Sequence, residues 1–280
     1  MFRLLSNHRI RHALLAGSLA LAAGYAAACA ISTAQELELG QQYAAEINRQ
    51  LPIVEDPFIQ RYMNQLCDRL ARYGTRNLEY TCYVVNTDAV NAFAIPGGFV
   101  YVNRGLIERA DNLSELAGVV AHEIAHVEER HGIEQVERVQ RANLGLTLAY
   151  ILIGRVPTGL ERAAIEVGAG LVFARYSREA EREADAVAVQ LTTAAGIDPN
   201  GLVTFFKELL DERERRPSLV EQWFSTHPLT EERIADTRDL IRQIPAAQFR
   251  NLTVDTPQFH EFQNRLRRQP PPPPQFRRRR

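Results

Sequence analysis

Two histidines and a glutamate stand close together in the segment AHEIAHVEERHG, residues 121–132, which contains the pattern HExxH. On an α-helix His122 and His126 are four residues apart, so both side chains lie on one face and can reach one metal ion. Glu123 lies one position further round and can accept a proton from a water molecule that the metal polarises. This spacing is typical of zinc-dependent hydrolysis, in which zinc needs a third protein ligand.

The third histidine of the segment, His131, is one candidate for that ligand. If the helix continues without a break, His131 lies nine residues beyond His122 and points to the opposite side of the helix. In the pattern HExxHxxGxxH a glycine breaks the helix, and Glu129 occupies that position here. We therefore exclude His131 as a ligand and expect it to end the helix, followed by a Gly132 cap.

A glutamate on a second helix is the other common third ligand, and the segment SREAEREADAVAVQL, residues 177–191, offers three. On a helical wheel Glu181 falls at the edge of the apolar stripe, whereas Glu179 and Glu183 point elsewhere. We therefore predict that Glu181 is the third ligand. Asp185, one turn further on, is placed to accept the free N–H of a ligating histidine and so to orient its ring.

Composition places the chain among ordinary globular proteins, since 45% of its 280 residues are hydrophobic and 24% are charged. The formal net charge of -1 gives no reason to expect a nucleic-acid partner. Positive charge is concentrated in the last sixteen residues, RLRRQPPPPPQFRRRR. We expect the five-proline run and residues 277–280 to form the disordered Pro/Arg-rich tail of a C-terminal extension, residues 246–280.

The N-terminus resembles an export signal, because three arginines precede an apolar stretch at residues 13–28 that is short for a membrane span. We therefore expect a signal peptide over residues 1–29. Cys29 follows two alanines, as in a bacterial lipobox, so we favour lipidation of Cys29 over a freely soluble exported protein. The lipid would then tether the protein to the membrane, most simply the outer membrane.

The two other cysteines, Cys67 and Cys82, would be exported with the chain. An oxidising compartment permits a disulfide between them, and their number is even once Cys29 is set aside. We favour the other interpretation, two small buried side chains on a helix and a strand, because sequence separation does not show whether their Cβ atoms meet.

Apolar spacing and turn residues predict the elements that position these groups. The prolines of residues 51–57 interrupt a helical pattern at residues 35–73, which predicts two helices. Residues 80–85 and the run NAFAIPGGFVYV, residues 91–102, predict a small antiparallel sheet with a hairpin around its Pro-Gly-Gly turn. Helices are predicted over residues 113–130, which carry HExxH, and over residues 177–194, 202–215 and 230–244.

The apolar run at residues 144–153 is too short to span a bilayer, so we predict a buried helix there. The chain as a whole is therefore predicted to be an α+β protein, mostly helical, with its main domain over residues 35–245.

Four segments occur in the order and approximate spacing of peptidase family M48, the zinc metallopeptidases that include HtpX, BepA and the CAAX prenyl endopeptidases: AFAIPGGFVYVNRGL, ELAGVVAHEIAHVEERHG, YSREAEREAD and STHPLTEERI. The chain resembles this family over about residues 36–242. The resemblance implies a gluzincin domain, zincin-like and mostly helical with a short sheet. It also implies one Zn²⁺ per chain, held by His122, His126 and Glu181, with Glu123 as general base and Asp185 behind a histidine ligand.

Two further groups of residues match the family. The match at His227 and Arg233 implies a role at the site. Either could stabilise the oxyanion of the tetrahedral intermediate, or His227 could occupy the open metal position and keep the enzyme latent. The run Asn91, Ala92, Phe93 and Ala94 resembles the family's substrate-aligning strand, which implies backbone hydrogen bonds to an extended peptide.

The chain departs from family members that carry several membrane spans or helical repeats. We therefore expect an exported endopeptidase of the periplasm or cell envelope that hydrolyses misfolded or unassembled envelope proteins. Its expected partners are unfolded polypeptides, and the membrane only through a lipid on Cys29. The alternative is a chaperone-like, zinc-containing binding protein with little proteolysis; the intact Glu123 argues against it, because binding alone needs no base.

Overall fold

The computed structural model describes residues 30–140 and 175–277. The expected signal peptide with Cys29, and the apolar run at residues 144–153, lie outside these ranges. Within the described ranges, no helix combines the length and apolar character needed to cross a membrane.

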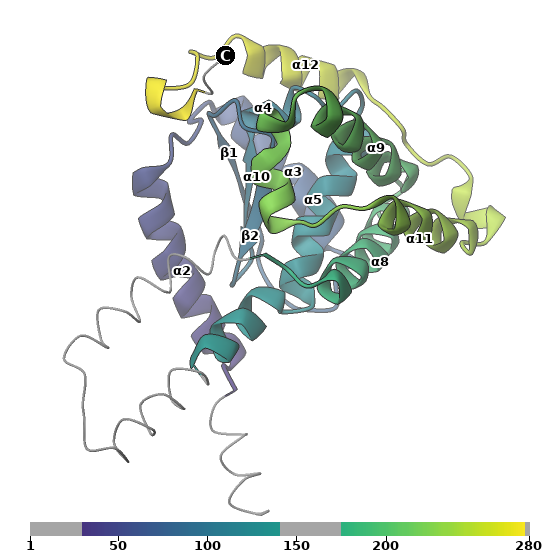
Figure 1. Cartoon of the computed structure of the whole chain (residues 1–280), viewed down its shortest axis with the longest axis horizontal. Helices are drawn as coiled ribbons and strands as arrows, with labels where there is room; N and C mark the ends of the chain where they lie inside the picture. Colours follow the sequence, from purple (N-terminus) through teal and green to yellow (C-terminus); the bar gives the residue numbers. More distant parts are fainter. Residues whose placement is uncertain (1–29, 141–174, 278–280) are drawn as a thin grey trace, which may run out of the picture.

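The central helix, α5 (Leu113–Glu128), is buried along its whole length and carries the HExxH segment. It packs against α8 (Arg178–Ala194) and α9 (Asn200–Arg215), as Figure 1 shows. The approach to α9 requires a glycine in α5, because a Cβ on Gly118 would lie 2.8 Å from the backbone nitrogen of Leu202. The helix that carries the two histidines is thus held on two sides by other helices.

In the described part of the chain the sheet has three strands, β1 (Thr81–Val85), β2 (Ala92–Ile95) and β3 (Phe99–Asn103), in the order β1-β3-β2. The predicted hairpin is confirmed, since β2 and β3 pair antiparallel. The sheet as a whole is mixed, however, because β1 pairs parallel to β3. Residues 86–91 carry the chain past β3 to the other edge of the sheet, which our prediction of an antiparallel sheet did not foresee.

Successive strand residues face two different cores, as the period of two in a strand requires. One face packs against α3 (Pro57–Ala71) and α5, and its buried side chains include Val84, Val100 and Val102. The other face is covered by α2 (Thr33–Gln50), and its buried side chains include Phe93, Ile95 and Tyr101. The strand β2 therefore runs between α2 and α5, beside the HExxH helix.

The remaining elements complete the helical part, and several of them were not predicted. The helices predicted at residues 35–73, 177–194, 202–215 and 230–244 are present as α2, α3, α8, α9 and α11. Of these, α11 spans Glu231–Arg242. The other elements are short and were not predicted: α4 (Arg104–Ile107), α10 (Pro217–Thr226), η1 (Ala246–Phe249), α12 (Pro257–Arg267) and η2 (Pro274–Phe276).

The C-terminal extension packs against the domain as far as Arg277. Our expectation of a disordered proline-rich tail is therefore wrong for the part of the tail that the structure describes. The α12 residue Phe262 is fully buried and stacks on Tyr62 of α3 at a ring distance of 4.4 Å. In the proline run, the carbonyl of Pro270 accepts hydrogen bonds from Asn86 and Arg104 at 3.1 and 3.0 Å. Apolar packing and carbonyl contacts fix a segment whose composition is typical of disorder.

Cys67 of α3 and Cys82 of β1 form a disulfide, with a Cα–Cα distance of 6.4 Å. Our preference for two free buried cysteines is therefore wrong. The reason is tertiary: α3 packs directly on β1, which brings together two Cβ atoms whose relative position the sequence does not show.

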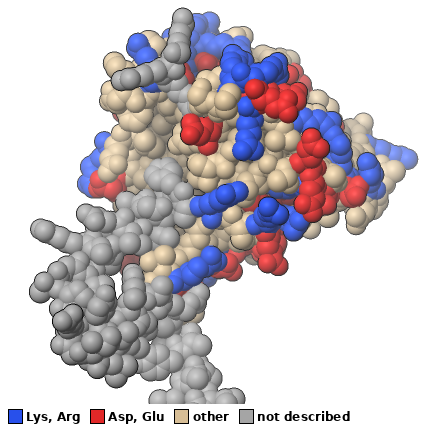
Figure 2. All heavy atoms as spheres, in the orientation of Figure 1, with Lys and Arg blue, Asp and Glu red and all other residues tan. Residues whose placement is uncertain are grey.

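Charges of both signs are interspersed over the face drawn in Figure 2. Arg182 of α8, for example, forms exposed ion pairs with Glu232 and Asp236 of α11 at 3.1 and 3.2 Å. These contacts join α8 and α11, which also carry the acidic residues and the arginine of the candidate site.

Candidate metal centre

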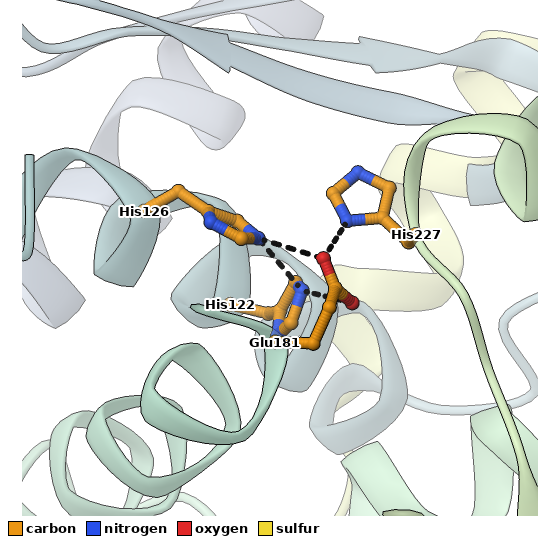
Figure 3. A group of neighbouring side chains, drawn as sticks. All are labelled: His122, His126, Glu181 and His227. Atoms are coloured by element: carbon orange, nitrogen blue, oxygen red, sulfur yellow. Dashed lines mark hydrogen bonds and ion pairs between the residues drawn. The ribbon is translucent and has the colours of Figure 1, made fainter. Parts of the chain in front are cut away.

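Four side chains from three helices meet at one point (Figure 3). His122 and His126 come from α5, Glu181 from the first turn of α8, and His227 from the end of α10. One donor atom of each lies within 4.8 Å of the others. The structure thus brings together the three predicted ligands and adds His227 as a fourth donor.

The shortest distances show how closely these donors converge. His126 Nε2 lies 3.1 Å from His122 Nε2 and 3.4 Å from Glu181 Oε1. His227 Nδ1 lies 3.0 Å from the same Glu181 oxygen. All four side chains are at most 1% exposed, so the cluster is buried in this structure.

Local sequence explains why Glu181 reaches this point. Ser177 caps α8 by accepting a hydrogen bond from the Ala180 N–H at 3.1 Å, so the helix begins just before Glu181. A carboxylate in the first turn of a helix is favoured by the partial positive charge of the helix N-terminus. Small side chains at Ala184 and Ala188 are buried along α8, which packs against α5.

The donor set fits a metal ion. Two imidazoles and a carboxylate are a usual ligand set of catalytic zinc. Both carboxylate oxygens of Glu123 and the Nε2 atom of His227 are buried and lack a hydrogen-bond partner of good geometry among the described residues; these two groups lie 3.5 Å apart. Because buried polar atoms without partners are rare in folded proteins, they indicate a site built around a further polar group.

Arg233 of α11 balances the negative charge of the site. Its guanidinium is buried, donates to Asp185 Oδ2 at 2.5 Å and to Asp185 Oδ1 at 2.9 Å, and forms an ion pair with Glu181. Burial opposes the ionisation of Glu181, but His227 and Arg233 outweigh it and hold the pKa of Glu181 well below its ordinary value. Burial likewise opposes the ionisation of Asp185, and Arg233 nevertheless lowers its pKa. Both carboxylates are therefore charged near neutral pH.

Asp185 also lies behind the first histidine. Its Oδ1 atom is 3.0 Å from His122 Nδ1, the nitrogen on the far side of the ring from the cluster. Such a contact keeps Nε2 free of a hydrogen and turned to the centre. The structure therefore places Asp185 where the sequence predicted it.

Glu123 lies beside the cluster and is completely buried. Burial raises its pKa above the ordinary value, against the opposing charges of His227 and His122. A carboxylate whose pKa is raised toward neutrality is better suited to take and return a proton.

The chain around His131 differs from our expectation. Helix α5 ends at Glu128, Arg130 has a positive φ of 60°, and a new helical segment, residues 131–140, begins at His131. His131 therefore does not end the HExxH helix, and Gly132 is not its cap. His131 stays outside the four-donor cluster, but its Nδ1 atom lies 2.9 Å from His126 Nδ1 and its Nε2 atom 3.1 Å from Glu183 Oε2.

Two aromatic residues that the sequence did not single out line the site. The ring of Tyr176 stacks on His126 at 3.9 Å, and the ring of Trp223 stacks on His227 at 4.7 Å. Tyr176 directly precedes the Ser177 cap in the segment YSREAEREAD, and Trp223 lies one helical turn before His227. Recognition of α10 as a helix would have placed Trp223 beside the histidine.

The predicted substrate strand is β2 with the residue before it. Ala92, Phe93 and Ala94 belong to the strand, which is buried and, within residues 30–140 and 175–277, has a strand neighbour on one side only. Asn91 is fully buried, and neither its side-chain oxygen nor its nitrogen has a hydrogen-bond partner in the described part of the chain. The Val90 N–H donates to the Leu219 carbonyl at 3.3 Å, so α10 lies beside the start of β2.

Comparison with known proteins gives consistent results. The family model "Peptidase family M48" matches residues 55–241. The chain is 33% identical over 229 residues to the beta-barrel assembly-enhancing protease of Shigella flexneri, which covers 79% of this chain and 47% of that protein. It is 28% identical over 201 residues to the mitochondrial metalloendopeptidase OMA1 of Schizosaccharomyces pombe, covering 71% and 57% of the two chains.

A shorter relative matches over most of its own length. The metalloprotease YcaL of Escherichia coli is 29% identical over 194 residues, which cover 64% of this chain and 74% of that protein. The chain spans about half the length of the beta-barrel assembly-enhancing proteases that it matches.

Proposed function

This chain belongs to peptidase family M48, and we propose that it is a metalloendopeptidase. In this proposal it uses one zinc ion to hydrolyse peptide bonds in misfolded or unassembled proteins of the bacterial cell envelope. The observation that carries the proposal is the four-donor cluster with the buried carboxylate of Glu123 beside it. In the proposal His122, His126 and Glu181 hold the ion.

The chain's own residues have distinct roles in this proposal. Bound zinc would lower the pKa of a water molecule toward ~7 and polarise the scissile carbonyl. Glu123 accepts the proton of the attacking water and passes it to the leaving amine, a role that its raised pKa favours. Asp185 orients His122, and the ion pair with Arg233 holds the carboxylate of Glu181 in place.

His227 has two candidate roles, and its position favours one of them. A group that stabilises the oxyanion must face the carbonyl of the substrate. His227 instead lies within the donor cluster, 3.0 Å from Glu181 Oε1. We therefore propose that His227 occupies a fourth position at the metal and keeps the enzyme latent until it is displaced. The same position supports the alternative of a chaperone-like zinc protein that binds polypeptides and seldom cleaves them.

The substrate side of the proposal rests on β2. An extended peptide could add to an edge strand through backbone hydrogen bonds, which tolerate many sequences. The unsatisfied amide of Asn91 supports this role, because it offers both a donor and an acceptor at the start of the strand. In this structure β2 and the cluster are buried, so binding of a polypeptide requires β2 to become accessible.

The compartment is also part of the proposal. The disulfide between Cys67 and Cys82 supports an exported protein, because disulfides persist mainly in oxidising compartments. The name of the Shigella flexneri relative says that it enhances the assembly of β-barrels, which supports substrates among envelope proteins. A signal peptide over residues 1–29 and a lipid on Cys29 would place the enzyme at the periplasmic side of a membrane.

Cleavage of unfolded casein by purified, zinc-loaded protein tests the activity. We expect slow cleavage by the unmodified chain, none by Glu123→Gln, and faster cleavage by His227→Ala, because the fourth donor has been removed. Retained zinc with no cleavage by the unmodified chain or by His227→Ala would support the chaperone-like alternative. Slower cleavage by His227→Ala would instead assign His227 to oxyanion stabilisation.

A further inference from the structure

Both ring nitrogens of His126 have polar neighbours, although metal binding would use only one of them. Its Nε2 atom faces the cluster, and its Nδ1 atom lies 2.9 Å from His131 Nδ1. His131 Nε2 in turn lies 3.1 Å from Glu183 Oε2. We propose that His131 and Glu183 position His126 through this chain of hydrogen bonds and so set the metal affinity of the site. The inference rests on the proposed use of His126 as a ligand.

The hydrogen atoms can be placed along this chain in only one consistent way. If His126 binds a metal through Nε2, its hydrogen is on Nδ1, which must donate. His131 Nδ1 then accepts, so the hydrogen of His131 is on Nε2 and is donated to the Glu183 carboxylate. Each of the three groups thus has a suitable partner, and the outer carboxylate determines which nitrogen of His126 is free to bind the metal.

The two histidine ligands are supported in matching ways. The Nδ1 atom of His122 lies 3.0 Å from Asp185, and that of His126 lies 2.9 Å from His131. Helix α8 supplies the carboxylate in both cases, directly for His122 and through an intervening imidazole for His126. Contacts of this kind raise the basicity of a ligating histidine and fix its orientation, and their loss typically lowers metal affinity 10–100-fold.

The backbone adopts an unusual conformation to bring His131 back to His126. Arg130 has a φ of 60°, a left-handed conformation that residues other than glycine adopt only at a cost. Its side chain holds the turn, because Nη2 donates to the Ile31 carbonyl at 2.5 Å and lies 3.4 Å from Glu36. With the ring of His131 only 3% exposed, the turn places a buried imidazole directly behind a ligand.

Two substitutions of His131 separate positioning from simple space filling. His131→Phe keeps a ring of similar size but removes the acceptor, whereas His131→Asn places an amide oxygen near the position of Nδ1. We expect the zinc dissociation constant, measured on the purified full chain by competition with a chromophoric chelator, to rise 10–100-fold for His131→Phe. His131→Asn should recover most of this loss because its amide oxygen can accept the hydrogen bond, even though asparagine fills less space than phenylalanine.

The visible absorption of cobalt-substituted protein is a second readout, because it reports the geometry of the ligands. We expect the spectrum to change for His131→Phe and to stay close to that of the unmodified chain for His131→Asn. Thermal unfolding of the metal-free proteins, measured in parallel, shows how much of any change is structural. Equal zinc dissociation constants for His131→Phe and the unmodified chain would overturn the proposal, as would equal losses in the Phe and Asn variants.

Glu183 supplies a test that does not alter the interior, because its side chain is 55% exposed. We expect Glu183→Ala to weaken zinc binding several-fold and Glu179→Ala, an exposed glutamate of the same helix, to leave it unchanged. If His131→Phe does not fold, this pair decides the question, and equal zinc affinity in the two variants would overturn the proposal. Tight zinc binding without peptide cleavage would contradict the proposed function and leave this inference intact.

Discussion

At the scale of single residues, Arg233 is the positive charge that contacts both buried acidic residues of the site. One guanidinium, 4% exposed, contacts both Glu181 and Asp185. Removal of the positive member of such a group leaves two buried carboxylates without their partner, which costs far more than the loss of a surface ion pair. The contrast with Arg182, whose side chain is 47% exposed and also pairs with two carboxylates, gives a matched comparison.

We predict that Arg233→Gln lowers the unfolding free energy of the metal-free protein by about 3–5 kcal/mol at neutral pH. Arg182→Gln should lower it by less than about 1 kcal/mol, because water screens its ion pairs. Urea unfolding followed by circular dichroism measures both. Similar small effects of the two substitutions would show that Arg233 is not the charge that stabilises the buried carboxylates.

The position of a site residue could be predicted from the sequence when it depends only on the helix that carries the residue. The spacing of His122 and His126 and the helical phase of Glu181 and Asp185 depend only on their own helices, and the structure places all four side chains at the cluster or directly behind it. The contact of His131 with His126 depends instead on the left-handed turn before it. That turn depends on the backbone conformation of Arg130 alone, which helix propensity does not predict.

At the scale of elements, long helices with regular apolar spacing could be predicted, and short ones could not. Helix α10 has ten residues and starts at a proline, and α12 follows an irregular segment; both owe their stability to tertiary packing rather than to propensity. The parallel pairing of β1 with β3 depends on the path of the connection between strands, which alternation of apolar residues does not reveal.

The contact between α9 and the start of α5 should make stability depend on pH. Glu208 of α9 lies close to Asp111 and Glu115, and burial followed by these charges raises its pKa to about 7. A carboxyl group with a raised pKa in the folded state binds its proton more tightly when folded, so its contribution to stability is lost as pH rises from about 4.5 to about 7.

We therefore predict that Glu208→Gln raises the unfolding temperature of the metal-free protein at pH 8 and changes it little at pH 4.5. Glu214→Gln, an exposed glutamate of the same helix, is the control and should have no such pH-dependent effect. Thermal unfolding at the two pH values measures the difference. An unfolding temperature at pH 8 that is unchanged by Glu208→Gln would mean that its carboxyl group is charged there without cost.

At the scale of the whole molecule, the folded domain extends beyond the residues that its motifs identify. The α12 segment packs on α3, and Gln263 donates to the carbonyls of Ile107 and Ala110 at 2.8 and 2.7 Å. Because each of these contacts joins residues that are more than 150 positions apart in the sequence, composition alone could not predict them. The C-terminal extension is thus part of the folded unit that supports the site.

We predict that Phe262→Ala lowers the unfolding free energy by about 3–5 kcal/mol, because it leaves a cavity beside Tyr62 where a fully buried ring is lost. Glu261→Ala, exposed on the same helix, should change it by less than about 0.5 kcal/mol. Denaturant unfolding of both variants measures the difference. A negligible effect of Phe262→Ala would show that the extension does not pack stably on the domain.

The zinc content of the purified protein tests the central claim most directly, because the proposed chemistry depends on one ion held by His122, His126 and Glu181. Elemental analysis after exhaustive dialysis should find one zinc per chain in the unmodified protein and in Glu179→Ala, and far less in Glu181→Ala. If Glu181→Ala retains one zinc per chain, or if the unmodified protein binds none, the assignment of this metal centre is contradicted.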